Sequence, residues 1–165
     1  MIASSSSLIA SAAPEFALDA AGHDEAVRLF RRRYNILSGR RPDEILLQNI
    51  LAGFANLPYE NLSKIIKFHR HGAHEAERLR LPEEVIEDHL RRRLGGTCFS
   101  LTFFLQAILL HHGFTCYIVM ADMRAGKNIH GAMIVWLNGV KHLVDPGYLL
   151  CRIHSVNPIL KWKAR

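Results

Sequence analysis

The spacing of apolar residues changes near Gly113, and this change limits the folds that the chain can adopt. Before Gly113, apolar side chains recur every three or four residues, which is typical of amphipathic helices. After it come short runs rich in β-branched and large apolar residues, which favour strands. A chain with its helices first and its strands afterwards predicts an α+β fold.

Four helices are expected before this change. The first runs from Asp24 to about Ile36, and the second opens at Pro42 with apolar residues at helical spacing. The third follows Pro82, with acidic residues in its first turn, and ends at Gly95-Gly96. The fourth, from Cys98 to His112, has a broad apolar face, so we expect it to be buried.

Three strands are expected afterwards, at Cys116 to Met123, Ile129 to Leu137 and Val140 to Asp145. The Asn138-Gly139 pair between the last two runs is the strongest short-range signal for a hairpin, because both residues tolerate the positive φ of a type I′ turn. The sequence therefore predicts an antiparallel sheet.

His130 and Asp145 fall on one face of this hairpin if its turn holds two residues. Leu137 then pairs with Val140, and the same register pairs Ala132 with Asp145. His130 precedes Ala132 by two residues and shares its face, so it lies diagonally opposite Asp145, within reach of a hydrogen bond. A slip of one residue would place the two side chains on opposite faces.

Cys98 stands directly after a double glycine, at the start of the fourth helix. A thiol attacks as the thiolate, and the free N–H groups and positive end of a helix N-terminus favour negative charge. The same N–H groups could form part of an oxyanion hole. Together, Cys98, His130 and Asp145 predict a Cys-His-Asp triad in which the carboxylate orients the imidazole.

Each triad residue also has a structural interpretation that involves no chemistry. Free cysteines are among the most buried residue types, so Cys98 could be an unreactive core residue. His130 could be an ordinary core or surface histidine in a chain with 10 histidines. Asp145-Pro146-Gly147 is also a typical turn at the end of a strand.

Composition narrows the class of protein. With 165 residues, 49% of them hydrophobic, the chain can bury a core, and no apolar run reaches the roughly 20 residues of a membrane-spanning helix. The three cysteines lack metal or disulfide spacing, which favours a reducing cytoplasm. The charge of +6 favours an anionic partner such as a phosphate-bearing cofactor, and no nucleic-acid-binding motif accompanies it.

Two local patterns carry simpler interpretations. His69, His71 and His74 are assigned to a loop, and the neighbouring Arg70 and missing carboxylates argue against a metal site. The arginine runs at 31–33 and 91–93 are interpreted as solvated helix ends. No metal is therefore expected.

Four separated segments resemble the arylamine N-acetyltransferases, over about residues 25 to 150. Residues 57–62, Leu-Pro-Tyr-Glu-Asn-Leu, are similar to the family's Pro-Phe-Glu-Asn-Leu motif. Gly95-Gly96-Thr97-Cys98 resembles its Arg-Gly-Gly-x-Cys nucleophile motif. His130 on its strand and residues 145–148, Asp-Pro-Gly-Tyr, resemble the other two triad segments, the last of which usually reads Asp-Val-Gly-Phe.

The resemblance implies a helical bundle followed by an antiparallel β-barrel, with a transglutaminase-like or cysteine-proteinase-like triad. It also implies ping-pong transfer, in which Cys98 takes an acetyl group from acetyl-CoA and passes it to an arylamine, arylhydrazine or similar amine. Tyr59 would line the acceptor pocket, although an aromatic ring packed under a helix is an alternative. The expected partners are a small amine and coenzyme A, with no membrane and no nucleic acid.

The chain also departs from the family. Leu94 stands where the family has Arg, Ser100 where a polar amide or acid is common, and Thr102 where Asn is usual. The family's third, lid-like domain is missing from the expected organisation, which is a flexible arm at 1–22, a helical bundle at 23–95, and the nucleophile helix with an incomplete barrel at 96–165. A cysteine hydrolase of transglutaminase or protease type and a non-catalytic truncated relative remain alternative functions.

Overall fold

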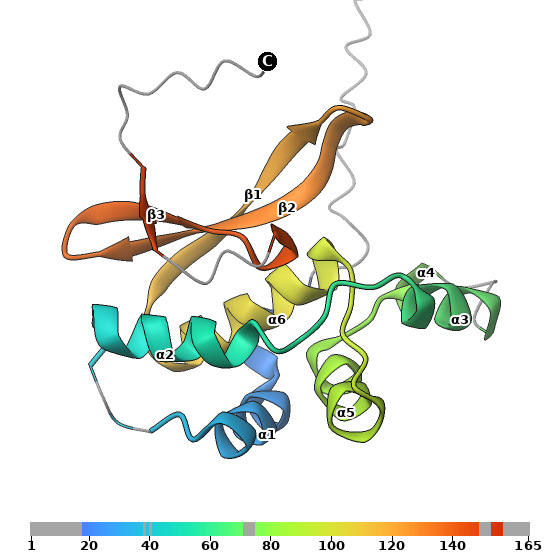
Figure 1. Cartoon of the computed structure of the whole chain (residues 1–165), viewed down its shortest axis with the longest axis horizontal. Coiled ribbons are helices and arrows are strands. Elements are labelled where there is room, and N and C mark those ends of the chain that lie inside the picture. Colours follow the sequence, from blue (N-terminus) through green and yellow to red (C-terminus); the bar gives the residue numbers. More distant parts are fainter. Residues whose placement is uncertain (1–17, 38, 40, 71–74, 149–152, 157–165) are drawn as a thin grey trace, which may run out of the picture.

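The structure, a computed structural model, describes residues 18–37, 39, 41–70, 75–148 and 153–156. Helices make up the first part and one antiparallel sheet the second, as the α+β prediction requires (Figure 1). In chain order the elements are η1 (Ala20–Gly22), α1 (Asp24–Tyr34), α2 (Glu44–Phe54), α3 (Leu62–Arg70), α4 (Glu75–Arg78), α5 (Pro82–Arg92), α6 (Cys98–His111), β1 (Thr115–Met123), β2 (Gly126–Leu137), β3 (Val140–Val144), η2 (Pro146–Tyr148) and β4 (His154–Ser155).

Local capping explains where several helices begin and end. Asp43 precedes α2, and its side chain accepts a hydrogen bond of 2.7 Å from the backbone N–H of Leu46. At the start of α5, the Glu84 carboxylate accepts a bond of 3.1 Å from the N–H of Leu81. Gly113 follows α6 with a φ of +79°, a conformation that glycine adopts without strain.

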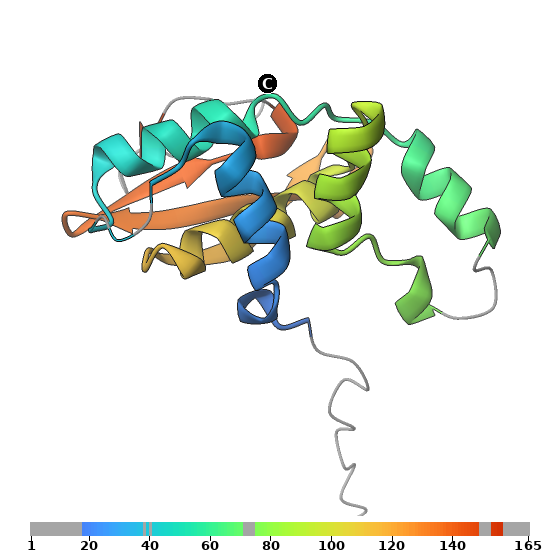
Figure 2. The ribbon, with the colours of Figure 1, turned by 90° about the horizontal axis from the view of Figure 1, so that it is seen from below.

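Helix α6 lies at the centre of the fold, as its broad apolar face predicts. It packs against β1 and β2 on one side and against α1 and α5 on the other (Figures 1 and 2). Phe104 is fully buried, and its ring lies 5.9 Å from Phe30 of α1 and 5.7 Å from Phe54 of α2. This packing fixes the direction of α6 and therefore the position of Cys98 at its N-terminus.

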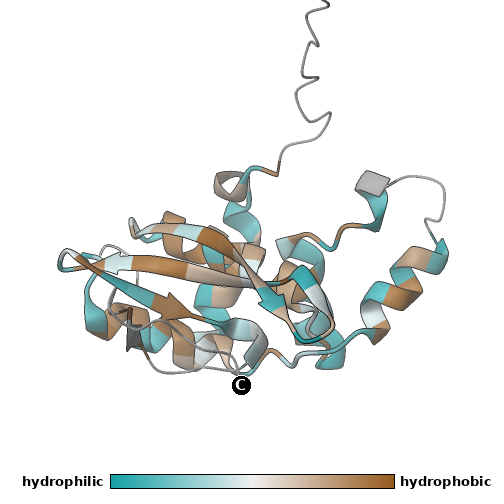
Figure 3. Cartoon of the chain, turned by 90° about the horizontal axis from the view of Figure 1, so that it is seen from above, coloured by the Kyte–Doolittle hydropathy of each residue, from teal (hydrophilic) through white to brown (hydrophobic). Residues whose placement is uncertain are grey.

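The strands form one sheet in the order β1-β2-β3-β4, with antiparallel neighbours throughout. In Figure 3 the central parts of β1 and β2 are coloured mainly brown, for apolar residues. Leu137 pairs with Val140, and Asn138 and Gly139 between them have φ values of 50° and 76°. The two-residue turn and the register predicted from the sequence are therefore confirmed, although β3 ends at Val144, one residue before Asp145.

Helices α3 and α4 were not expected, and the prediction that His69 lies in a loop is wrong. His69 lies in the last turn of α3, whereas His71 and His74 are outside the described residues. The Glu60 side chain starts this helix by accepting bonds from the N–H and hydroxyl of Ser63. Because α3 lies at one end of the molecule and exposes apolar side chains such as Phe68, its pattern did not resemble a core-facing helix (Figure 2).

The predicted N-terminal arm is only partly described. Residues 1–17 lie outside the described residues, and Ala20–Gly22 form η1, which packs against α6. The Asp19 side chain caps this turn by accepting a 2.9 Å bond from the N–H of Ala21. In the part of the chain that the structure describes, no helix has the length and apolar character needed to cross a membrane.

Candidate active site

Cys98 is the first residue of α6 and only 5% exposed. The preceding turn is held against residues 58–60: Gly96 donates to the Pro58 carbonyl at 3.2 Å and accepts from the Glu60 N–H at 2.9 Å. A Cβ atom at Gly95 would lie 1.9 Å from the Pro58 carbonyl oxygen, so this position admits only glycine. The turn therefore brings Cys98 to a defined place with the first N–H groups of α6 around it.

His130 and Asp145 form a buried pair. His130 comes from β2 and Asp145 directly follows β3, and the His130 Nε2 lies 2.7 Å from the Asp145 Oδ2. The other carboxylate oxygen accepts hydrogen bonds from the N–H groups of Gly147, at 3.0 Å, and Tyr148, at 3.2 Å. The buried carboxylate is thus fully hydrogen-bonded, and the contact expected from the hairpin register is present.

Gly147 is where the three predicted triad residues meet. A Cβ atom at this position would lie 2.9 Å from His130 Cε1, 3.1 Å from Cys98 Cβ and 3.3 Å from Asp145 Oδ1. Cys98, His130 and Asp145 therefore surround a single residue without a side chain. The sequence indicated Gly147 only as part of a turn, because nothing local shows which side chains pack against it.

Thr102 joins the helix that carries Cys98 to the strand that carries His130. Its buried hydroxyl donates a 3.0 Å hydrogen bond to the carbonyl of Gly131, the residue after His130. Thr102 itself lies one helical turn after Cys98. Sequence comparison identified Thr102 only as a departure from the family motif. Its role in the geometry depends on a contact between residues 29 positions apart.

Tyr148 covers one side of the imidazole. Its ring lies edge-on to His130 at 5.0 Å, and its hydroxyl donates to the sulfur of Met123 at 3.5 Å. The ring is also 57% exposed, so it lies between the buried pair and solvent. The sequence contained this residue in the Asp-Pro-Gly-Tyr segment but gave no sign of the ring contact.

The other described cysteine differs from Cys98 in its surroundings. Cys116 lies on β1 against the hydrophobic core, and burial raises the pKa of its thiol to about 11. A thiol with this pKa is protonated at neutral pH and is a poor nucleophile. Cys151 lies outside the described residues.

A family model described as N-acetyltransferase matches residues 44–159. This range is most of the chain and includes every residue of the site described above. The chain belongs to the arylamine N-acetyltransferase family.

Solved arylamine N-acetyltransferases have a similar fold. The Mycobacterium abscessus enzyme aligns with a TM-score of 0.67 and 21% identity, covering 88% of this chain and 51% of that one. A Bacillus cereus enzyme, described as having a unique Cys-His-Glu catalytic triad, aligns with a TM-score of 0.54 and 20% identity. This alignment covers 75% of this chain and 49% of the Bacillus cereus chain. The chain therefore spans about half the length of these family members, and the likeness supports helices followed by an antiparallel sheet.

A shorter sequence match is to the uncharacterized acetyltransferase L280 of Acanthamoeba polyphaga mimivirus. It is 34% identical over 58 residues, which are 32% of this chain and 28% of the viral protein. This match adds a third relative whose name is that of an acetyltransferase.

Tyr59, expected by family resemblance to line the acceptor pocket, lies beside the Cys98 turn. Its backbone forms an isolated parallel bridge with Gly96, and its side chain is 48% exposed. Among the described residues, no hydrogen bond or ring contact joins Tyr59 to Cys98, His130 or Asp145. The turn thus brings Tyr59 near the site through its backbone.

Two of the departures from the family motif take part in the turn. Leu94 contributes its carbonyl, which accepts from the His89 Nδ1 at 3.2 Å. The Ser100 hydroxyl donates a hydrogen bond to the Thr97 carbonyl at 3.2 Å. A Cβ atom added at Gly96 would lie only 2.3 Å from the Ser100 Oγ, so the hydroxyl occupies the space that a side chain at Gly96 would need. Within the described ranges, no group of three or more His, Cys, Asp or Glu residues could hold a metal ion.

Proposed function

We propose that this family member transfers an acetyl group from acetyl-CoA to an arylamine, an arylhydrazine or a similar small amine, through an acetyl-Cys98 intermediate. The observation that carries the proposal is the 2.7 Å contact between His130 and Asp145, with Cys98 packed against the same Gly147. The triad of the Bacillus cereus relative, Cys-His-Glu, supports a carboxylate as the third member. The arrangement is of the cysteine-proteinase and transglutaminase type.

In the first half-reaction, the Cys98 sulfur attacks the thioester carbonyl of acetyl-CoA. The Asp145 carboxylate accepts from His130 Nε2, which leaves Nδ1 to take the proton of the thiol and form a thiolate-imidazolium pair. The tetrahedral oxyanion is stabilised by the free N–H groups in the first turn of α6. The bond to the coenzyme sulfur then breaks, and the imidazolium proton passes to that sulfur, which releases coenzyme A.

In the second half-reaction, the amine nitrogen attacks the carbonyl carbon of acetyl-Cys98. His130 accepts the proton that the amine loses, and the carbon-sulfur bond breaks to release the amide product and the thiolate. Asp145 stabilises the charged imidazole in both halves and holds its orientation. Its second oxygen, bound to the N–H groups of Gly147 and Tyr148, keeps the carboxylate itself from rotating.

Three further assignments belong to this proposal. The net charge of +6 suits an anionic donor such as coenzyme A. Tyr59, half-exposed beside the turn, lines the acceptor pocket. A reducing cytoplasm keeps the Cys98 thiol available for catalysis.

The proposal is tested by intact-mass measurement after incubation with acetyl-CoA, with and without an arylamine. We expect one acetyl group on the native protein, none on Cys98→Ala, and loss of the acetyl group with amide formation when the amine is added. Cys116→Ala, which removes the partly buried thiol with the raised pKa, is the matched control and should still be acetylated. Acetylation that persists in Cys98→Ala would overturn the proposal.

The same experiment separates the alternative functions. Release of free acetate without amide formation would indicate a cysteine hydrolase. For a non-catalytic relative, iodoacetamide would alkylate Cys98 no faster than a cysteine in an unstructured peptide.

A further inference from the structure

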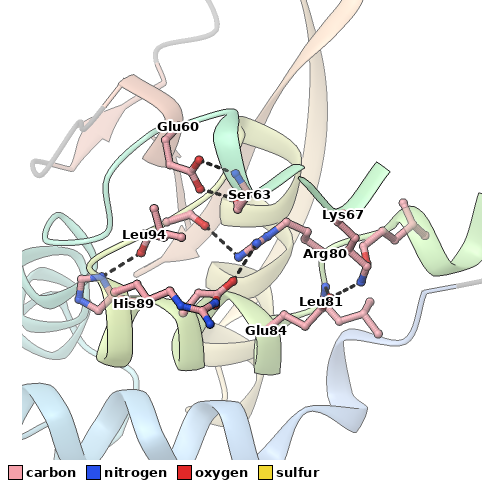
Figure 4. A network of polar contacts seen from close by, with 12 residues as sticks. Glu60, Ser63, Lys67, Arg80, Leu81, Glu84, His89 and Leu94 are labelled. Carbon is pink, nitrogen blue, oxygen red and sulfur yellow. Dashed lines mark hydrogen bonds and ion pairs between the residues drawn. The ribbon is translucent and has the colours of Figure 1, made fainter. Parts of the chain in front are cut away.

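The turn before Cys98 is held by hydrogen bonds to three successive carbonyls, each from a different part of the chain. Figure 4 shows the two of these bonds that come from the side chains of His89 and Arg80. Such a turn has little freedom to change its course, because each carbonyl has a directed partner. The three bonds are His89 Nδ1 to the Leu94 carbonyl at 3.2 Å, Arg80 Nη2 to the Gly95 carbonyl at 3.3 Å, and the Glu60 N–H to the Gly96 carbonyl at 2.9 Å.

Of the donors in these three bonds, which all lie in the described part of the chain, only the Arg80 guanidinium carries a charge. Its side chain is 6% exposed, and its Nη1 donates to the Asp88 Oδ2 at 3.0 Å. A buried guanidinium must be paired with a negative charge, and Asp88 provides that charge from within α5. With one nitrogen bound to Asp88, the planar guanidinium directs its other terminal nitrogen toward the Gly95 carbonyl.

Leu94 occupies the position where the family motif has an arginine before the double glycine, and its apolar side chain cannot donate a hydrogen bond. Arg80 reaches the same turn from the segment before α5. The turn therefore has a guanidinium contact although its own sequence lacks the arginine.

We propose that Arg80 is a positioning residue for Cys98, which fixes the Gly95 carbonyl and thereby the direction in which α6 begins. This inference rests on the proposed acetyl transfer. Gly95 lies three residues before Cys98, so a change in its peptide plane moves the sulfur relative to His130. Displacement of a reacting atom by about 1 Å costs on the order of 100-fold in rate.

The chain offers a matched control for Arg80. Arg92 Nη1 donates to the other oxygen of Asp88, also at 3.0 Å, but its side chain is 67% exposed and the structure gives it no bond to the turn. Removal of either arginine takes one cation from Asp88. Removal of Arg80 alone also takes the donor from the Gly95 carbonyl.

The test compares the native protein with Arg80→Leu, Arg80→Lys and Arg92→Leu. For Arg80→Leu we expect kcat to fall by about 100-fold with little change in KM for acetyl-CoA. We also expect iodoacetamide to alkylate Cys98 more slowly at neutral pH, with the rate at Cys116 unchanged, as measured by peptide mass spectrometry. Arg80→Lys should recover part of both losses, because an ammonium keeps the charge and a donor but lacks the planar fork. Arg92→Leu should keep native values.

A purely structural role for Arg80 predicts a different pattern. Arg80→Leu would then unfold at lower urea concentration, while kcat and the alkylation rate of Cys98 stayed within twofold of native, and this result would overturn the proposal. If Arg80→Leu does not fold, the Arg80→Lys variant tests the proposal instead. A native kcat and a native alkylation rate of Cys98 in Arg80→Lys would also overturn the proposal. The alkylation comparison does not depend on acetyl transfer, so failure of the native protein to accept an acetyl group counts against the proposed function alone.

Discussion

Gly147 is the glycine of the site around which Cys98, His130 and Asp145 are packed. An added Cβ atom would meet His130, Cys98 and Asp145 at 2.9 to 3.3 Å. To admit the added atom, at least one of these side chains would have to shift, which would change how the three are arranged. The absence of a side chain at Gly147 is therefore a condition of the geometry of the proposed triad.

We predict that Gly147→Ala lowers kcat by about 100-fold, because the added methyl group separates Cys98 from His130. The free energy of unfolding should fall by only about 1–3 kcal/mol, as for other overpacked sites. Steady-state kinetics and urea unfolding measure the two effects. Native kcat in Gly147→Ala would show that the three side chains do not act together around this position.

Thr102 also contributes to the geometry, because it joins α6 to β2. Thr102→Val has nearly the same shape but leaves the buried Gly131 carbonyl without its hydroxyl donor, at a cost of about 1–3 kcal/mol in unfolding free energy. Thr102→Ser should retain the bond and recover most of that stability. Urea unfolding of the three proteins tests this, and equal stability of the Val and native forms would contradict it.

At the scale of elements, the β2-β3 hairpin sets the face on which His130 and Asp145 lie. Its turn residues Asn138 and Gly139 both have positive φ, which matches the right-handed twist of the strands. A slip of one residue in this hairpin would move the imidazole and the carboxylate to opposite faces. The turn therefore contributes to the site although it is at the far end of the strands.

Gly139→Val should lower the free energy of unfolding by about 1–2 kcal/mol, because a β-branched residue at a φ of +76° is strained. No atom lies within 4 Å of the added Cβ position, so crowding plays no part. Gly126→Val, at a glycine of β2 without a positive φ, is the control and should cost less. Equal losses in the two variants, measured by thermal or urea unfolding, would show that backbone strain at the turn is not the cause.

For the whole molecule, we expect the free energy of unfolding to depend on pH through buried histidines. His112 follows α6, is 8% exposed, and its Nε2 has no hydrogen-bond partner among the described residues. Burial lowers the pKa of His112 to about 4, with smaller contributions from the charges of Arg31 and His111. The folded state therefore disfavours the protonated imidazole.

Because the folded pKa of His112 is depressed, its unfolded form binds the proton first as the pH falls. Stability should be fully present above pH 6.5 and decline toward pH 4, by up to about 1.4 kcal/mol per pH unit. His112→Gln should reduce this slope. Part of the slope should remain, because burial also lowers the pKa of His89. Urea unfolding at several pH values measures the slope, and an unchanged slope in His112→Gln would refute the assignment.

Patterns within short stretches of sequence were sufficient to predict the α+β class, helix α6, the β2-β3 turn and its register. Each of these depends on interactions between residues close in the chain: helical periodicity, strand alternation and the φ preferences of Asn138-Gly139. The proximity of His130 to Asp145 followed from the same local rules. Helix α3 was missed because its exposed apolar residues do not face the core of the described chain.

Only the tertiary structure decided how the thiol, the imidazole and the surrounding residues meet. Cys98 and His130 both lie next to Gly147 because α6 packs on the sheet, and that packing depends on the whole core. Thr102 binds the carbonyl of a residue 29 positions away, and Arg80 binds one 15 positions away. Such contacts carry no local signal in the sequence, since the free energy that forms them comes from burying many apolar side chains together.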